Sequence, residues 1–251
     1  MAPLTLVRSE KLPHQVARVL AARIVNAEYE ARPTPTEQEI VDEFGVSKTV
    51  AREVMGLLVS MRLVRVRHGR RMVIRSTAQW NYFDPRVIEV LGDSHEIRRL
   101  LSELHQVRVL IEPEVAALAA TKASPEHLSR LRVHLDAMME KPVDPEAYLE
   151  HDVAFHGELV AAVGNRIIAQ IVDSTAELLR ASRRVTQLLP HALDMATRGH
   201  AAVYEAVAQH DAEGARQAML DHLAIAVMAW TDPDSLSGNS ESAPTASALG
   251  R

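Results

Sequence analysis

Apolar side chains recur at helical spacing over most of the chain after residue 95. One stripe, with intervals of three and four residues, contains Ile97, Leu101, Leu104, Arg108, Ile111, Val115 and Leu118. Stretches of the same period follow at about 124–140, 146–163, 166–189, 192–210 and 212–230. Because only 4% of the residues are aromatic and alanine and leucine abound, packed helices are favoured over a sheet sandwich. We predict an all-α antiparallel helical bundle over 95–231, with Pro113 kinking or restarting its first helix.

The first 78 residues follow a different order. Three helices and a hairpin are predicted, at 14–28, 37–44, about 48–61 and 63–74. Thr36 and Glu39 have the spacing of a capping box, Gly45 is typical of a helix C-terminus, and Ser47 caps the third helix. A helix, a helix–turn–helix and a hairpin in that order predict a winged helix-turn-helix domain (α+β) over 1–78. The whole chain is therefore expected to be mainly α.

The remaining segments are a connector at 79–94 and a polar tail at 232–251, which we expect to be disordered. There are no cysteines, so any metal must be held by nitrogen and oxygen ligands. The N-terminus lacks the apolar core of a signal peptide, and no stretch approaches the ~20 apolar residues of a membrane span. We therefore expect a soluble cytoplasmic protein without a membrane partner.

Charge divides the chain in the same way as the predicted domains. Residues 1–78 hold 13 Lys and Arg against 8 Asp and Glu, while the remainder is acidic and the whole chain has a net charge of −5. This pattern indicates that the N-terminal domain alone binds a polyanion. The start of the second helix of the helix–turn–helix would enter the major groove of double-stranded DNA, and a cationic hairpin tip would lie along the minor groove. The residues expected to contact DNA there are Ser47, Lys48, Thr49, Arg52, His68, Gly69 and Arg70.

Four polar residues interrupt the apolar helical faces of the C-terminal region, and they are Asp152, His156, His200 and His222. The first two are four residues apart, so they share one helix face. A buried aspartate is costly unless it is paired, hydrogen-bonded or bound to a metal. A carboxylate with neutral imidazoles is a ligand set for a divalent transition metal. The alternative is that the histidines are satisfied core residues and the aspartate pairs with an arginine.

These residues together resemble a known family of bacterial regulators. PTEQEIVDEFGVSKTVAREVMGLLVSMRLVRVRHG at 35–69 resembles the N-terminal domain of GntR-type regulators. Arg108, the Asp152 and His156 pair, Gly164-Asn165, His200 and His222 resemble the FCD effector domain of the FadR subfamily. QWNYFD at 79–84 and VRVLIEP at 107–113 are most similar to repressors of galactonate-type sugar-acid operons.

The resemblance implies a metabolite-responsive repressor of a sugar-acid or organic-acid operon that acts as a homodimer on operator DNA. In that family the aspartate and the three histidines hold a divalent metal, here zinc, nickel or manganese, with zinc favoured. Arg108 and Asn165 would bind a small carboxylate effector, and Gln38 would join the DNA contacts. Gln38, Lys48 and Arg62 depart from the family pattern, which implies an unusual operator, with Lys48 anchoring a phosphate rather than reading guanine.

Two other functions stay open at this point. A metal-dependent hydrolase is disfavoured because the chain lacks HExxH and has no glutamate in an obvious base position, so we expect no enzymatic activity. A constitutive DNA-binding dimer with a structural metal is the second. The partner of Arg108 distinguishes a dimer with a structural metal from a protein that binds an effector, because a guanidinium in an apolar stripe needs an anion. That anion is either the effector or a carboxylate, namely Asp152 or a glutamate on a facing helix.

Overall fold

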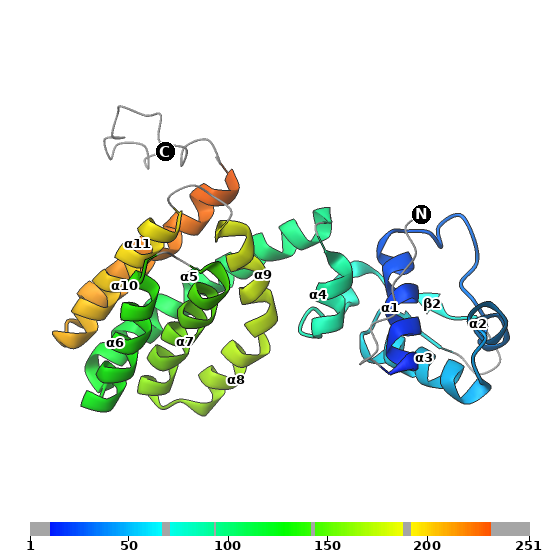
Figure 1. The fold of residues 1–251 in the computed structure, drawn as a ribbon, viewed down its shortest axis with the longest axis horizontal. Helices are drawn as coiled ribbons and strands as arrows, with labels where there is room; N and C mark the ends of the chain where they lie inside the picture. Colours follow the sequence, from blue (N-terminus) through cyan, green and yellow to red (C-terminus); the bar gives the residue numbers. More distant parts are fainter. Residues whose placement is uncertain (1–10, 67–70, 93, 142–143, 188–191, 232–251) are drawn as a thin grey trace. The chain divides into compact units, whose positions relative to one another are not determined.

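The computed structural model describes residues 11–66, 71–92, 94–141, 144–187 and 192–231 (Figure 1). These residues form two compact units, Met1–Arg99 and Leu100–Arg251. The expected tail at 232–251 and the predicted DNA contacts His68, Gly69 and Arg70 lie outside the described residues. The predicted fold class is confirmed, since a small two-stranded wing accompanies an otherwise helical chain.

The first unit is a winged helix whose elements begin and end where short-range signals place them. Its elements are α1 Leu12–Val25, α2 Glu37–Phe44, α3 Lys48–Ser60, β1 Val64–Arg65, β2 Val73–Ile74, the 3-10 helix η1 Thr77–Gln79 and α4 Pro85–Leu91. Thr36 and Glu39 form the predicted capping box, and Gly45 ends α2 in the left-handed region at φ 63°. The wing strands are antiparallel, with Val64 opposite Ile74. The first helix ends three residues before its predicted end, because Ala27 has a left-handed φ of 57°.

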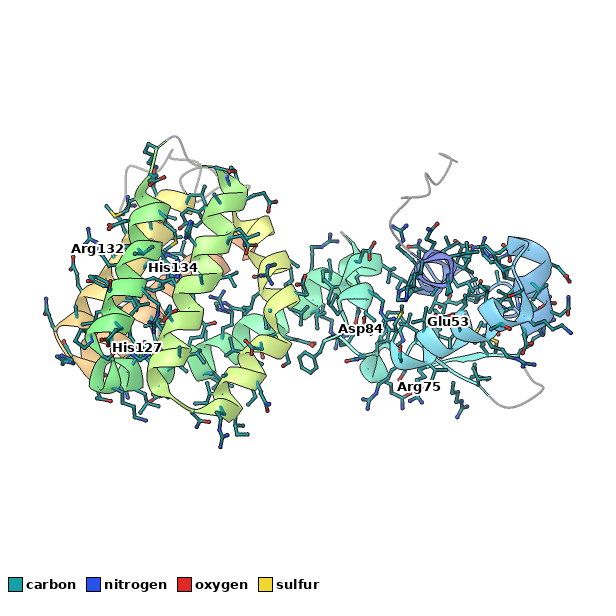
Figure 2. The ribbon with its side chains drawn as sticks, turned by 60° about the horizontal axis from the view of Figure 1, so that its bottom comes forward. Glu53, Arg75, Asp84, His127, Arg132 and His134 are labelled. Carbon is teal, nitrogen blue, oxygen red and sulfur yellow. The ribbon has the colours of Figure 1, made fainter. Side chains whose placement is uncertain are left out.

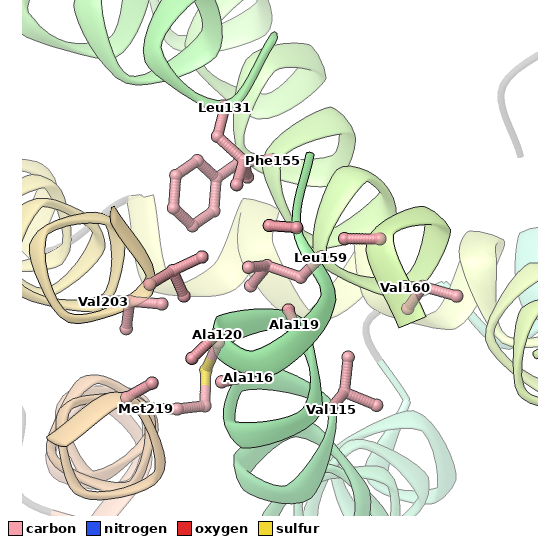
Figure 3. Packing of buried hydrophobic residues seen from close by; sticks show 14 of the residues in the cluster. Val115, Ala116, Ala119, Ala120, Leu131, Phe155, Leu159, Val160, Val203 and Met219 are labelled. Atoms are coloured by element: carbon pink, nitrogen blue, oxygen red, sulfur yellow. The ribbon is translucent and has the colours of Figure 1, made fainter. Parts of the chain in front are cut away.

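The second unit is a set of packed helices. They are α5 His95–Lys122, α6 Pro125–Met139, α7 Pro145–Val163, α8 Arg166–Ser174, α9 Ala176–Gln187, α10 Ala192–Ala208 and α11 Ala212–Thr231. The helix α6 packs along α7, and α10 packs along α11. In the core, Ala116, Ala119 and Ala120 of α5 lie among the larger side chains of Phe155, Leu159 and Met219 from other helices (Figure 3). Small residues on one helix let its neighbours approach closely, which fixes where the polar residues between them meet.

One detail of the helical prediction was wrong, and one of the two alternatives at Pro113 is excluded. The helix predicted at 166–189 is interrupted at Thr175, which separates α8 from α9. Pro113 lies inside a continuous α5 and does not restart the helix. Residues on both sides of it, such as Leu104 and Val115, are buried and hold α5 in the core across the missing backbone hydrogen bond.

The apolar stripe of α5 leaves the core toward its C-terminus. Ile97, Leu101 and Leu104 are buried, but Leu118, which was expected to share their face, is 38% exposed. A repeat of 3.5 residues drifts by ~20° per heptad relative to a straight helix of 3.6 residues per turn. Over three heptads the drift reaches about 60°, so the alanines take over the core position near the end of the helix. No described helix is long and apolar enough to cross a lipid bilayer.

Candidate metal centre and its pocket

Three helices bring the four predicted metal ligands together in the core of the second unit. Asp152 and His156 lie one turn apart on α7, His200 lies on α10, and His222 lies on α11. All four are buried, with exposed fractions between 0% and 7%. One ring nitrogen from each histidine lies within 4.8 Å of the others. Asp152 adjoins this group, because its Oδ1 is 3.2 Å from Nε2 of His200.

The ring nitrogens of the cluster lie close to one another. Nδ1 of His156 is 2.8 Å from Oε2 of Glu112, a carboxylate that can only accept, so this nitrogen carries the proton. In the neutral ring of His156 the other nitrogen, Nε2, is then unprotonated. This Nε2 lies 3.2 Å from Nε2 of His200. A carboxylate that orients a histidine in this way is the usual outer partner of a metal ligand.

The donor set fits a divalent transition metal. Nitrogens bound to one ion at 2.0–2.1 Å are about 2.8–3.4 Å apart at octahedral or tetrahedral angles, and the spacing between His156 and His200 lies in this range. Burial, followed by the nearby His200 and His156 rings, lowers the pKa of His222 well below 6.5. This ring is therefore neutral at physiological pH, as a metal ligand must be.

Arg108 is buried in the same region, and its partner differs from those expected. Its Nε donates to Oε1 of Glu112 at 2.6 Å and its Nη2 to Oε2 at 3.3 Å. The partner is thus one turn away on the same helix, rather than Asp152 or a glutamate on a facing helix. Burial alone would raise the pKa of Glu112, but the charge of Arg108 and the hydrogen bonds from His156 and Arg108 hold it well below 4.5. The pair uses two of the five N–H donors of the guanidinium, so Arg108 keeps capacity for another anion.

A pocket opens beside this cluster. The pocket is narrow and partly open to solvent. Arg108, Glu112 and His156 line one part of its wall. The remaining described lining is largely aliphatic and comes from α5, α7, α8, α9 and α11. The histidine cluster and the pocket therefore share a residue, His156.

In the first unit the predicted DNA contacts form an exposed surface at the start of α3. Ser47, Lys48, Thr49 and Arg52 are exposed, and Oγ of Ser47 accepts from the backbone N–H of Val50 as the helix cap. Arg52 is 72% exposed and pairs with Glu37 of α2 at 3.1 Å. Gln38 is exposed on α2 and donates to Asp42. A cationic helix start that faces solvent suits phosphate oxygens.

Two models of known protein families match the chain, one within each unit. The family model described as "Bacterial regulatory proteins, gntR family" matches residues 12–74, and the model described as "FCD domain" matches residues 103–225. The chain belongs to the gntR family and carries an FCD domain. Its place in the FadR-like subfamily confirms the predicted resemblance, and the family consists of transcription regulators rather than enzymes.

Curated relatives cover most of the chain. The galactonate operon transcriptional repressor of Escherichia coli K12 is 29% identical over 212 residues, which are 84% of this chain and 93% of that protein. The transcriptional repressor NanR of Cronobacter sakazakii and a putative L-lactate dehydrogenase operon regulatory protein of E. coli K12 are each 28% identical, over 88% of this chain and 86% of theirs. The solved structure of Lar, which controls the Listeria monocytogenes agr system, has a TM-score of 0.58 at 18% identity and covers 89% of this chain and 99% of its own. That likeness shows the fold alone.

Some histidines and one predicted effector residue of the FCD domain lie outside this centre. Oδ1 of Asn165 caps α8 by accepting from Ile167 and Ile168, and Asn165 is not among the described residues that line the pocket. His134 on α6 and His151 on α7 form a separate pair with their Nδ1 atoms 3.1 Å apart (Figure 2 labels His134). The FCD domain therefore contains a buried histidine cluster and a half-buried histidine pair.

Two residues of the FCD centre were missed from the sequence. Glu112 was detectable, because it is four residues from Arg108 and such pairs meet on a helix. Gly199 precedes His200 inside α10, and a Cβ atom built there would lie 2.6 Å from Nδ1 of His222. Glycine in a helix interior costs roughly 0.5–1 kcal/mol relative to alanine, so its presence beside a ligand signalled a close approach. Gly199 makes room for the His222 ring.

Proposed function

We propose that the chain is a metabolite-responsive repressor that binds operator DNA as a homodimer through its first unit. The metal would be held by His156, His200 and His222 with Asp152, and zinc suits this set best, with nickel and manganese as alternatives. An organic acid would bind in the neighbouring pocket and release the DNA. One observation carries this proposal: the histidine cluster shares His156 with an adjoining pocket that Arg108 also lines.

The DNA-binding part rests on the exposed start of α3. Lys48 and Arg52 supply the cations there, and Ser47 and Thr49 supply hydroxyls that suit phosphate contacts. Because one winged helix reads only a few base pairs, two related copies are needed for useful specificity. The names of the relatives, which are repressors or regulators of operons, support the same role.

The proposal that the second unit senses a metabolite rests on the charged groups beside the pocket. A bound divalent ion supplies a Lewis acid that attracts the carboxylate of the effector. Arg108 adds a second cation beside it, and Glu112 holds both Arg108 and His156 in place. The helix α5, which carries Arg108 and Glu112, begins at His95 within the first unit, so the chain itself connects the pocket with the DNA-binding unit.

The pairing of Arg108 with Glu112 also favours a second function. If the pair is only structural, the protein is a DNA-binding dimer whose metal stabilises the fold without sensing a metabolite. The two functions differ in one measurement, because only a sensor changes its DNA affinity when an acid binds.

The test begins with genomic DNA fragments captured by the purified protein and sequenced, followed by anisotropy titrations on the enriched fragment. We expect Lys48→Ala and Arg52→Ala to weaken binding by at least about tenfold, and affinity to fall steeply with salt. The matched control is Lys141→Ala, which removes an exposed lysine of the second unit. Equal binding by all three variants would contradict the assignment of the DNA surface.

The same fragment then tests sensing. The double variant His156→Ala/His200→Ala should still bind DNA but lose the response to acids that release the unmodified protein. A response that survives in this variant would contradict the proposed site. Light scattering of the free protein gives the oligomeric state, and a monomer at the concentrations that bind DNA would contradict the dimer.

A further inference from the structure

We propose that the pocket takes a monocarboxylate with an apolar body, with at most one hydroxyl beside the carboxylate, rather than a sugar acid or a dicarboxylate. This inference rests on the proposed function, in which the pocket is the effector site. It differs from what the name of the galactonate repressor suggests, and it follows from the lining of this pocket.

The wall of the pocket has one polar end. Ten of its fourteen described lining residues have aliphatic or methionine side chains, and the four others are Arg108, Glu112, His156 and Thr175. Three of these four are joined to one another by the contacts of Glu112, so they form a single group beside the metal cluster. The anionic end of a ligand therefore has only one place to bind among the described residues.

The rest of the wall offers few partners for hydroxyl groups. Oγ1 of Thr175 already donates to the carbonyl of Val172 at 2.8 Å, so this hydroxyl has only acceptor capacity left. Ile171, Val172 and Leu179 surround it on α8 and α9 with side chains that form no hydrogen bonds. Hydroxyls of a polyhydroxylated acid that lie against this wall would have no partners there, which is unfavourable, whereas an alkyl chain gains from contact with the same wall.

The net charge of the cluster favours a ligand with one carboxylate over a ligand with two. Arg108 contributes one positive charge, and Glu112 and Asp152 contribute one negative charge each, while the ligand histidines are neutral in a metal-bound state. A divalent ion brings the sum over these residues to +1. One carboxylate neutralises this charge, whereas the second carboxylate of a diacid would lie against the aliphatic wall unpaired.

The experiment compares four six-carbon acids on the full-length, zinc-loaded protein, with binding measured by calorimetry and by the shift in Tm. The acids are hexanoate, 2-hydroxyhexanoate, adipate and galactonate. We expect the first two to bind at least about tenfold more tightly than the last two, a difference of ~1.4 kcal/mol. Galactonate or adipate binding as tightly as hexanoate, or no binding of either monocarboxylate, would overturn the proposal.

A pair of isosteric variants locates the binding site. Val172→Thr adds a hydroxyl to the pocket wall and should reduce the preference for hexanoate over galactonate at least about threefold. Val133→Thr makes the same change on the exposed side of α6 and should leave the preference unchanged. Equal effects of both variants would place the ligand elsewhere. Because no DNA is used, failure here leaves operator binding intact, and failure to bind DNA leaves the ligand preference intact.

Discussion

The two units of this chain differ in the exposure of the residues proposed to function in them. In the first unit the residues proposed to bind DNA are exposed, and the buried polar residues are Thr34 and Asp84. In the second unit the proposed metal and effector residues are themselves part of the core. Function and folding can therefore be changed separately in the first unit, whereas in the second unit a change in the site is also a change in the core.

The largest effect is expected from Arg108→Ala. This change leaves Glu112 charged in a buried position, and removing one partner of a buried ion pair costs about 3–5 kcal/mol. The free energy of unfolding, measured with urea on the metal-free protein, should fall by that amount. The double variant Arg108→Met/Glu112→Gln removes both charges but keeps an acceptor for Nδ1 of His156, and it should lose less stability than the single variant. If the double variant is the less stable one, the pair is not the source of the effect.

Metal removal is expected to have the next largest effect, confined to the second unit. At a free metal concentration of 100 times the Kd, binding stabilises the folded state by ~2.7 kcal/mol, so chelation should lower the Tm. The protein with His156→Ala/His200→Ala should show no metal-dependent change, while His134→Ala/His151→Ala, which alters the separate histidine pair, should keep it. A metal-dependent Tm in the first double variant would contradict the ligand assignment.

A smaller loss is expected from Thr36→Ala in the first unit. The change removes the side chain that accepts from the backbone N–H of Glu39, and losing such a cap typically costs ~1 kcal/mol. The measurement is again urea unfolding, with Thr49→Ala, an exposed threonine at the second residue of α3, as the control. A loss of stability as large as that of Arg108→Ala would contradict the expectation that this change in the first unit costs less than a change in the core site of the second unit.

The smallest effects on stability are expected at the DNA surface. Lys48 is exposed and Arg52 has only an exposed ion pair with Glu37, so alanine at either position should change the free energy of unfolding by no more than about 0.5 kcal/mol. The same variants are expected to lose DNA affinity. If either one unfolds the protein, its loss of DNA binding says nothing about contact with DNA.

Local signals made most of the fold predictable. The capping boxes at Thr36 and Ser124, the left-handed Gly45 and the prolines at helix starts act within one turn, so the sequence shows them directly. The interruption at Thr175 has no such signal, since no glycine or proline is present and the threonine hydroxyl donates to Val172 in the preceding turn. Its position depends on packing between helices, which a single sequence does not display.

The residues that meet at the candidate site were predictable from the sequence, but the residue that orients them was not. Polar residues on apolar faces identified Asp152 and the three histidines, because burial of such groups needs a reason. Glu112 was missed because only facing helices were considered as a source of a partner for Arg108. Which nitrogen of His156 points inward depends on Glu112, so the orientation of the ligand required the structure.

Glu39 couples the wing to the start of α2. Its carboxylate accepts from the backbone N–H of Thr36 in the capping box and also binds the guanidinium of Arg71, which follows the wing tip and donates to the carbonyl of Thr34 as well. These bonds, with that to Arg71 first, lower the pKa of Glu39 to about 2, so the coupling persists across the physiological pH range. Opening of the wing would therefore remove the guanidinium that holds Glu39 in the capping box, and we expect the amide hydrogens of the first turn of α2 to exchange with solvent deuterium faster when the wing opens.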